Sequence, residues 1–303
     1  MREHTVRIAA RSLLLAAVGA CARIEPAPTT SAGSFGGDDD ESSSSSGNTG
    51  SSSSSSGGNT GSGSSGSSGS SGTPGAGALR AGDDVWTLDV AGRSRSVRVH
   101  VPPAITGQAL PVVIALHGNG DVAANFEATS GLKTRADESS FVLLTPDGIP
   151  RDVTVGSNTA PNVPWDAYNL YENNWDLQLM IALRQRVLAT GSIAASKVSV
   201  YGFSQGGYMA YRVAAALSSD FSCAAVLSAA DPSGDPVPFT RLIPISLMIG
   251  TNDYGIAQAR ATEQALTAAG HEHEYVEIEG LGHALAPAPR RFEPLDYCLG
   301  KSL

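Results

Sequence analysis

Apolar runs of strand length alternate with segments of helical period along most of this chain. The apolar runs are continuous rather than alternating with polar residues, which is typical of strands buried on both faces. Strands that alternate with helices predict parallel strands joined by helical crossovers, with helices covering both faces of one sheet. The strand runs are 112–116, 141–148, 197–203, 223–230, 242–253 and 273–283, and the helical segments are 125–139, 175–190, 206–219 and 255–270.

Ahead of these segments lies a stretch with a different pattern, "VWTLDVAGRSRSVRVHVPP". It alternates on both sides of Ala91-Gly92, which predicts a β-hairpin. The predicted fold is therefore the α/β class: a mostly parallel twisted sheet with helices on both faces and an antiparallel N-terminal hairpin. The apolar residues expected to pair across the hairpin are Val85, Leu88 and Val90 with Val97, Val99 and Val101.

The composition of the first 78 residues does not allow a hydrophobic core to form. Arginines precede the short apolar run "SLLLAAVGA", which is too short to span a bilayer and is typical of a signal peptide. The run ends at Cys21 and resembles a bacterial lipobox, so we expect 1–21 to be a lipoprotein-type signal peptide with Cys21 as the lipidated residue. The alternative is ordinary secretion with an incidental cysteine. Residues 22–78 are rich in Ser and Gly and are expected to form a disordered tether.

Residues 79–303 have the composition of one globular domain of about 225 residues. The formal net charge of −9 and the lack of a basic cluster in this part argue against nucleic acid as a partner. Because an exported domain can keep disulfides, Cys223 and Cys298 are candidates for a bridge, and two buried free thiols are the alternative.

Ser204 lies within "KVSVYGFSQGGYMAYRVAAAL", where a predicted strand becomes a predicted helix. A serine exposed on such a sharp turn needs very small neighbours two residues before and two after, and Gly202 and Gly206 meet that need. This pattern in this context predicts a nucleophile elbow. The alternative is a tight turn that contains a serine.

A serine nucleophile needs a base, and His283 in "GLGHAL" is the candidate because it follows the last strand. Its alternative role is that of a buried core histidine. His117 ends an earlier strand and is expected to brace its loop. The other histidines are His4 in the signal, His100 in the hairpin, and His271 and His273, which are expected to be solvated rather than to bind metal.

The acid that holds the base should lie between the serine and the histidine in sequence. Asp253 ends the strand before the histidine-bearing strand and is preferred, while Asp231 ends the preceding strand and is the alternative. Asp253 could instead begin the following helix as its N-cap.

An oxyanion produced by ester attack needs backbone N–H donors. The amide of Gln205, directly after the serine, is one candidate. The second should come from "HGNG", with Asn119 preferred over Gly120, although this segment could simply be a glycine turn.

Taken together, "LDVAGRSRSVRVHVPP", "LPVVIALHGNG", "KVSVYGFSQGGYMAYRVA", "MIGTND" and "VEIEGLGHA" occur in the order found in α/β-hydrolases. The chain resembles most closely the secreted polyhydroxybutyrate depolymerases, feruloyl esterases and acetyl xylan esterases. The resemblance implies a triad of Ser204, Asp253 and His283, with oxyanion donors at Asn119 and Gln205. It departs at Ala284-Leu285, where many relatives have Trp-Pro, and "GFSQGG" is also similar to carboxylesterases and acyl-thioesterases.

The long segment "GIPRDVTVGSNTAPNVPWDAYNLYENN" connects a strand to a helix and carries Trp165, Tyr168 and Tyr171. Long loops in compact domains are often functional. We expect these aromatic side chains, with His117, to bind substrate, and the alternative is that one or two of them pin the loop to the core.

These features predict an exported serine esterase that needs no cofactor or metal and hydrolyses carboxylic esters through an acyl-enzyme. The expected substrates are acyl or feruloyl groups on polysaccharide or a polyester, and the expected membrane contact is only through the lipid anchor. The alternatives are a carboxylesterase or thioesterase of small esters and a surface lipoprotein that binds a polymer without cleaving it.

Overall fold

The computed structural model describes residues 77–103, 108–149, 164–168, 174–233 and 239–303, and the backbone alone of 151–155 and 158–162. Cys21, Tyr171 and the predicted tether up to residue 76 lie outside the described residues. The elements are β1 Gly82–Val90, β2 Arg93–Val101, β3 Leu110–Leu116, α1 Ala123–Ser130, α2 Leu132–Ser139, β4 Val142–Pro146, β5 Arg151–Val155, β6 Asn158–Asn162, α3 Trp175–Leu188, β7 Ile193–Phe203, α4 Gln205–Ala216, β8 Cys223–Leu227, β9 Ile245–Gly250, α5 Ile256–Ala269, β10 His273–Ile278, the 3₁₀ helix η1 Arg290–Phe292 and α6 Glu293–Leu299.

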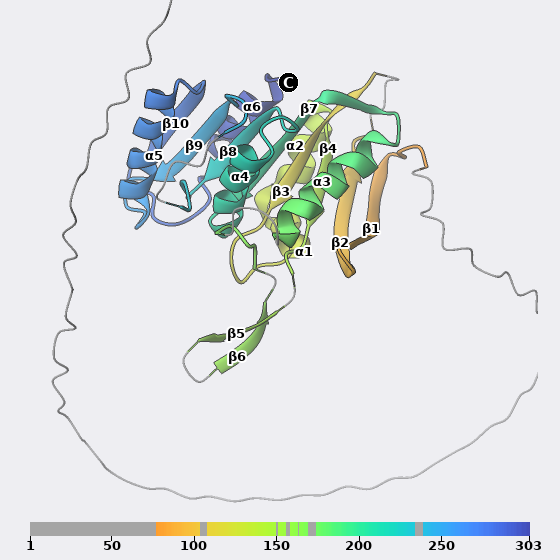
Figure 1. The fold of residues 1–303 in the computed structure, drawn as a ribbon, viewed down its shortest axis with the longest axis horizontal. Helices are drawn as coiled ribbons and strands as arrows, with labels where there is room; N and C mark the ends of the chain where they lie inside the picture. Colours follow the sequence, from red (N-terminus) through yellow and green to blue (C-terminus); the bar gives the residue numbers. More distant parts are fainter. Residues whose placement is uncertain are drawn as a thin grey trace, which may run out of the picture. The chain divides into compact units, whose positions relative to one another are not determined.

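Eight strands form one sheet in the order β1-β2-β4-β3-β7-β8-β9-β10 (Figure 1). The pairs β1–β2 and β2–β4 are antiparallel, and all other neighbours are parallel. Strands β5 and β6 form a separate antiparallel pair. The predicted fold, a mostly parallel sheet with an antiparallel N-terminal hairpin, is confirmed.

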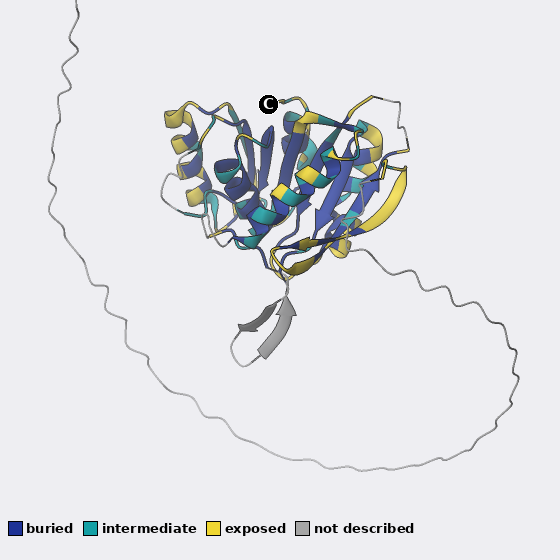
Figure 2. Cartoon of the chain, turned by 45° about the vertical axis from the view of Figure 1, so that its right-hand side comes forward, coloured by how far each residue is buried: buried dark blue, intermediate teal, exposed yellow. Residues whose placement is uncertain are grey.

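Side chains from alternate positions of the central strands pack into two cores, one on each face of the sheet. In β3, Val112 and Ile114 belong to the first core, and Val113 and Ala115 belong to the second. Helices α3 and α4 cover the first core, while α1, α2 and α6 cover the second. Figure 2 shows the consequence: the central strands are buried, whereas the edge strand β1 and the outer side of α5 are largely exposed. Continuous apolar runs were the correct signal for strands covered on both faces.

The hairpin forms as predicted, but its register differs from the expected one. Ala91 and Gly92 both have positive φ, at 54° and 74°, and form the two-residue turn. This turn pairs Trp86 with Val97, so Trp86 is buried and Val85 is 55% exposed. The expectation that Val85 belongs to the apolar row was wrong, because side chains alternate strictly between the two faces of a strand.

Two other local features refine the predicted helices. The segment predicted as one helix over 125–139 is divided into α1 and α2 at Gly131, which has a φ of 77°. Helix α3 begins after Asn174, whose side chain accepts hydrogen bonds from the N–H groups of Asp176 and Leu177. Asp176 is thereby fixed in the first turn of the helix.

Cys223 and Cys298 form a disulfide with an S–S distance of 2.03 Å and a Cα–Cα distance of 5.2 Å. The bond joins the first residue of β8 to α6. Both residues are buried in the second core, so the last helix is attached to the sheet by a covalent bond as well as by packing.

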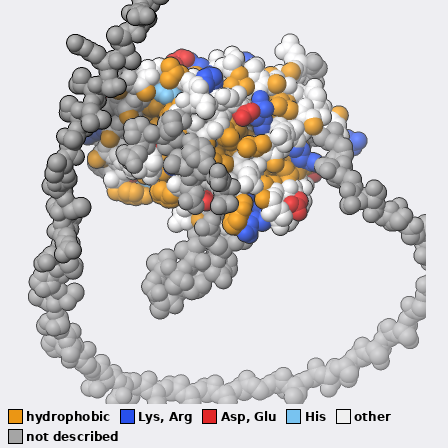
Figure 3. All heavy atoms as spheres, in the orientation of Figure 1, with side chains coloured by type: hydrophobic (Ala, Val, Ile, Leu, Met, Phe, Trp, Pro, Cys, Tyr) orange, Lys and Arg blue, Asp and Glu red, His pale blue; other side chains and the backbone are white. Residues whose placement is uncertain are grey.

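On the face drawn in Figure 3, positive and negative side chains lie interspersed among apolar and uncharged ones. Within the described residues, no helix is both long enough and apolar enough to cross a membrane.

Candidate active site

Ser204 lies between the end of β7 and the start of α4, with φ at 55° and ψ at −122°. This backbone conformation is unfavourable for a residue with a side chain. A Cβ atom added to Gly202 would lie 2.0 Å from the Gly206 carbonyl oxygen, and one added to Gly206 would lie 2.2 Å from the Leu116 oxygen. The two glycines therefore let β3, β7 and α4 meet closely enough for Ser204 to project above the sheet.

Ser204 and His283 are brought together from positions 79 residues apart in the chain. Ser204 Oγ lies 2.7 Å from His283 Nε2, and His283 Nδ1 lies 2.8 Å from Asp253 Oδ2. The carboxylate accepts the Nδ1–H, which leaves Nε2 free to accept from the serine hydroxyl. This is the arrangement that activates a serine hydroxyl as a nucleophile.

The acid is held by its own turn. The Asp253 side chain is fully buried, and its Oδ1 accepts the Gly255 N–H at 2.8 Å. The N-cap of α5 is Gly255, not Asp253. The alternative acid, Asp231, instead accepts the backbone and hydroxyl of Ser233. The structure therefore brings Asp253, and not Asp231, to the base.

The turn after β9 and the loop after β10 are tied to each other by backbone contacts. The Asn252 N–H donates to the Leu281 oxygen at 2.9 Å. Gly250 packs against the same peptide, since a Cβ there would lie 2.0 Å from the Leu281 oxygen. The separation between acid and base is thus set by two loops that contact each other directly.

The loop after β3 passes directly beside the serine. A Cβ atom on Gly118 would lie 3.5 Å from the Ser204 Cβ and 3.3 Å from the Phe203 ring. Asn119 follows Gly118 at this approach, and Gln205 is the first residue of α4. Both predicted oxyanion residues therefore belong to backbone that borders Ser204.

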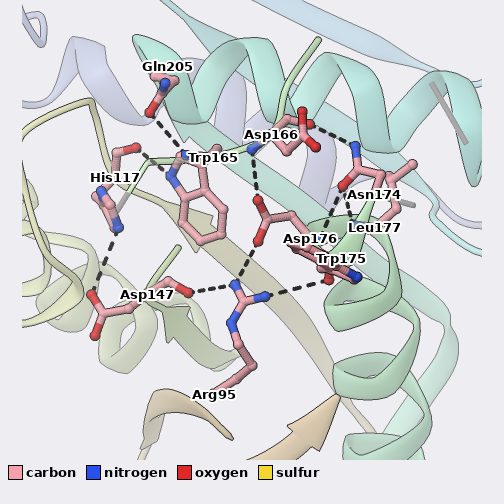
Figure 4. Close-up of polar contacts among 10 residues, drawn as sticks. All are labelled: Arg95, His117, Asp147, Trp165, Asp166, Asn174, Trp175, Asp176, Leu177 and Gln205. Atoms are coloured by element: carbon pink, nitrogen blue, oxygen red, sulfur yellow. Dashed lines mark hydrogen bonds and ion pairs between the residues drawn. The ribbon is translucent and has the colours of Figure 1, made fainter. Parts of the chain in front are cut away.

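The side chains of His117 and Trp165, which were expected to bind substrate, are both buried, and this arrangement matches the alternative in which the aromatic residue pins its loop to the core. Their rings lie 5.0 Å apart, and Trp165 Nε1–H donates to the His117 carbonyl oxygen at 2.9 Å (Figure 4). The Trp165 N–H donates to the side-chain oxygen of Gln205 at 3.1 Å. Trp165 therefore joins the loop after β3 to the residue that follows Ser204.

His117 itself braces its loop, as expected. Its Nδ1–H donates to the Gly118 carbonyl oxygen at 2.8 Å. Burial lowers the pKa of His117. The hydrogen bond to the Gly118 carbonyl and then the Asp147 carboxylate, 3.9 Å from Nε2, oppose this only in part. The His117 imidazole is therefore neutral inside the protein.

A buried ion pair supports the segment that carries Trp165. Arg95 Nη2 lies 2.6 Å from Asp176 Oδ1, and it also donates to the Asp147 carbonyl oxygen at 2.9 Å (Figure 4). The second oxygen of Asp176 accepts the Asp166 N–H at 2.7 Å. The start of α3 thereby holds the residue next to Trp165.

Two tyrosines are strongly exposed: Tyr168 packs against Tyr208 of α4, and Tyr254 contacts the base. Tyr168 is 62% exposed, and its ring centroid lies 6.3 Å from that of Tyr208. Tyr254 is 77% exposed, and its hydroxyl lies 3.2 Å from His283 Nε2. The sequence reasoning missed Tyr254, and its position directly after the candidate acid was the signal that could have found it. Within the described residues, no group of three His, Cys, Asp or Glu side chains could hold a metal ion.

The strand order and the elbow that carries Ser204 define an α/β-hydrolase. The chain belongs to the Esterase family, whose model, described as "Putative esterase", matches residues 89–275. This match includes Ser204 and Asp253 and ends before His283.

A curated relative, "Putative esterase NocK" from Nocardia uniformis subsp. tsuyamanensis, is 29% identical over 167 residues. The alignment covers 54% of this chain and 46% of that protein, so the chain spans about half the length of the curated relative it matches.

Solved structures with this fold include esterases and an S-formylglutathione hydrolase. A thermostable esterase has a TM-score of 0.57 at 19% identity, covering 73% of this chain and 63% of that chain. A ferulic acid esterase has a TM-score of 0.50 at 16% identity, and the match covers 68% of this chain and 92% of that chain. An S-formylglutathione hydrolase from Agrobacterium tumefaciens has a TM-score of 0.52 at 16% identity, and the match covers 72% of this chain and 91% of that chain. At these identities the likeness shows the fold, and the family membership supports carboxylic ester hydrolysis.

Proposed function

We propose that this protein is a serine carboxylic-ester hydrolase that works through an acyl-enzyme. The observation that carries the proposal is the hydrogen-bonded series Ser204, His283 and Asp253, with distances of 2.7 Å and 2.8 Å. Its serine stands on a strained elbow between strand and helix, a conformation that a purely binding surface has no need to maintain.

In the proposed acylation step, Ser204 Oγ attacks the ester carbonyl carbon while His283 Nε2 takes the hydroxyl proton. Asp253 stabilises the resulting imidazolium and holds its ring orientation. When the tetrahedral intermediate collapses, the bond to the leaving oxygen breaks and that oxygen takes the proton from Nε2. Water, activated by the same histidine, then hydrolyses the acyl-enzyme.

The negative charge on the tetrahedral intermediate needs donors beside Ser204. We assign this role to the backbone N–H groups of Gln205 and Asn119. The first lies at the N-terminus of α4, where the helix dipole also favours negative charge. The bond from Trp165 to the His117 carbonyl, together with its bond to the Gln205 side chain, fixes both segments before substrate arrives.

The proposed substrates are acyl or feruloyl esters on polysaccharide or a polyhydroxyalkanoate-type polyester. The sequence resemblance supports this class, and the exposed ring of Tyr254 offers apolar surface beside His283. Small esters and thioesters are the second candidate, favoured by the "GFSQGG" sequence. We further propose export and lipid anchoring through Cys21, with residues 22–78 as a tether, on the sequence pattern alone.

The experiment is to measure hydrolysis of p-nitrophenyl acetate, p-nitrophenyl butyrate and methyl ferulate by the full chain and by Ser204→Ala. The variant should lose nearly all turnover of every ester, and mass spectrometry of the parent should show an acyl group on Ser204 during turnover. Equal rates for parent and Ser204→Ala would overturn the proposal. The ratio of the rates for acetate, butyrate and ferulate separates the two substrate classes.

The role of the acid is tested separately. Asp253→Asn keeps the shape of the side chain but no longer favours the required histidine tautomer. We expect kcat to fall by about 10⁴-fold, the magnitude known for the equivalent change in a serine protease. A loss of less than about tenfold would remove Asp253 from the mechanism.

A further inference from the structure

Tyr254 places a second hydroxyl group at the atom of His283 that exchanges protons. Its oxygen lies 3.2 Å from His283 Nε2, while Ser204 Oγ lies 2.7 Å from the same nitrogen. The Tyr254 and His283 rings are 4.5 Å apart and inclined by 31°. The hydroxyl therefore reaches Nε2 from a ring packed against the imidazole.

The same turn that holds the acid holds this tyrosine. The Asp253 N–H donates to the Gly250 oxygen at 3.0 Å, and the Gly255 N–H donates to the Asp253 side chain at 2.8 Å. Tyr254 lies between these two bonds in sequence. Its backbone is thus fixed by the contacts that position Asp253, although its side chain is 77% exposed.

The proposed reaction places a second oxygen near Nε2. In acylation, Nε2 first receives the proton of Ser204 and then delivers it to the oxygen of the departing alcohol. The departing oxygen must therefore come within hydrogen-bond reach of Nε2. A hydroxyl 3.2 Å from this nitrogen is placed to contact that oxygen as well.

The hydroxyl is a donor at neutral pH. Partial desolvation where the ring packs on His283, followed by the negative charge of Asp253, raises the pKa of Tyr254 above its ordinary value, which already lies above neutral pH. It therefore keeps its proton under conditions in which His283 must exchange one.

We propose that Tyr254 is a further catalytic residue that donates a hydrogen bond to the departing alcohol oxygen. As the bond between the carbonyl carbon and that oxygen breaks, the electron pair moves to the oxygen. The proton on His283 Nε2 is transferred to it, and Tyr254 keeps its own proton throughout. The contribution of Tyr254 is greatest for alkyl alcohols, whose oxygen gains the most negative charge, and small for p-nitrophenol. This inference rests on the proposed acyl-enzyme mechanism.

The test compares the full chain with Tyr254→Phe on acetate esters of p-nitrophenol, phenol, trifluoroethanol and ethanol. The acyl group is constant, and kcat/KM reports only steps up to its transfer. We expect hydrolysis of ethyl acetate to lose about tenfold, the effect of one hydrogen bond, and hydrolysis of p-nitrophenyl acetate to lose much less. The plot of log kcat/KM against the pKa of the alcohol is therefore steeper for Tyr254→Phe than for the parent.

Tyr208→Phe is the matched control, because the Tyr208 hydroxyl donates to the Gln258 side chain at 3.1 Å and not to His283. It should change all four esters by the same factor. A uniform change in Tyr254→Phe, or no change, would overturn the inference. So would faster hydrolysis of all four esters, which would mean that Tyr254 competes with Ser204 for the histidine.

A circular dichroism melting scan verifies that Tyr254→Phe is folded. Ser204→Ala, measured beside it, separates the two proposals. If Ser204→Ala is inactive and Tyr254→Phe changes all esters equally, the acyl-enzyme mechanism stands and the role of Tyr254 fails. If Ser204→Ala retains full activity, both fail.

Discussion

The ion pair between Arg95 and Asp176 gives the sharpest prediction about stability. Both side chains are almost completely buried, at 2% and 0% exposure. Replacing Asp176 by Ala leaves a guanidinium in the interior without its carboxylate, and it also removes the acceptor of the Asp166 N–H. Breaking one partner of a buried pair costs about 3–5 kcal/mol.

For a domain of this size, each kcal/mol lowers the melting temperature by about 2–4 °C. We therefore expect Asp176→Ala to melt about 6–20 °C below the parent in a calorimetric or circular dichroism scan. Ester hydrolysis should also fall at temperatures where the variant is still folded, because Asp176 holds the backbone next to Trp165, which braces the loop after β3.

Two further variants decide whether burial of the charge is the cause. Arg95→Met combined with Asp176→Leu removes both charges and should recover most of the lost stability. Glu277→Ala breaks an arginine–carboxylate pair of similar length, 2.7 Å, at an exposed site, and it should change the melting temperature little because water screens the pair. The reasoning is refuted if Asp176→Ala melts within about 2 °C of the parent, or if the double variant is no more stable than the single one.

Other residues give predictions of similar kind. Gly206→Ala should give an insoluble or inactive protein because its Cβ would lie 2.2 Å from backbone, whereas Gly300→Ala, with no contact below 3.4 Å, should express and hydrolyse esters like the parent. Replacing both Cys223 and Cys298 by Ala should lower the stability by about 2–5 kcal/mol in a urea titration, since the bond closes a long loop. Because the pKa of His117 is lowered by burial, the unfolded chain binds a proton there more readily, so stability falls as the pH drops below about 6.5. His117→Gln should weaken that pH dependence, and an unchanged profile would show that other groups cause it.

The elements of the sheet could be predicted because strands buried on both faces leave continuous apolar runs. The pairing of Ser204 with His283 and Asp253 was also within reach, although the contacts span 79 and 30 residues. In a parallel sheet the carboxyl ends of the strands meet at one edge, so the positions of residues along the strands place them together. These three side chains lie where that reasoning expects them.

The hairpin register was also within reach of the sequence. A two-residue turn at Ala91-Gly92 pairs Val90 with Arg93 and, counting back, Trp86 with Val97. Val85 and Leu88 are three residues apart and cannot share a face of a strand. The apolar character of Val85 misled the prediction where the count along the strand would have corrected it.

The orientation of the loop aromatics could not be predicted from the sequence. Trp165 is buried because Gln205, the His117 carbonyl and the support at Asp166 converge on it from distant segments. Tyr168, three residues further on, is exposed. Nothing in the local sequence distinguishes the two, since the difference arises from partners in other elements.

The disulfide between β8 and α6 divides the proposed catalytic residues in an unexpected way. The segment that it closes into a ring contains Asp253 and His283, whereas Ser204 lies before the ring, directly after the neighbouring strand β7. A protease that cuts once inside this ring leaves a single covalent molecule, and its fragments separate only after reduction. The bond therefore keeps the acid and the base attached to the sheet that carries the nucleophile even when the chain between them is broken.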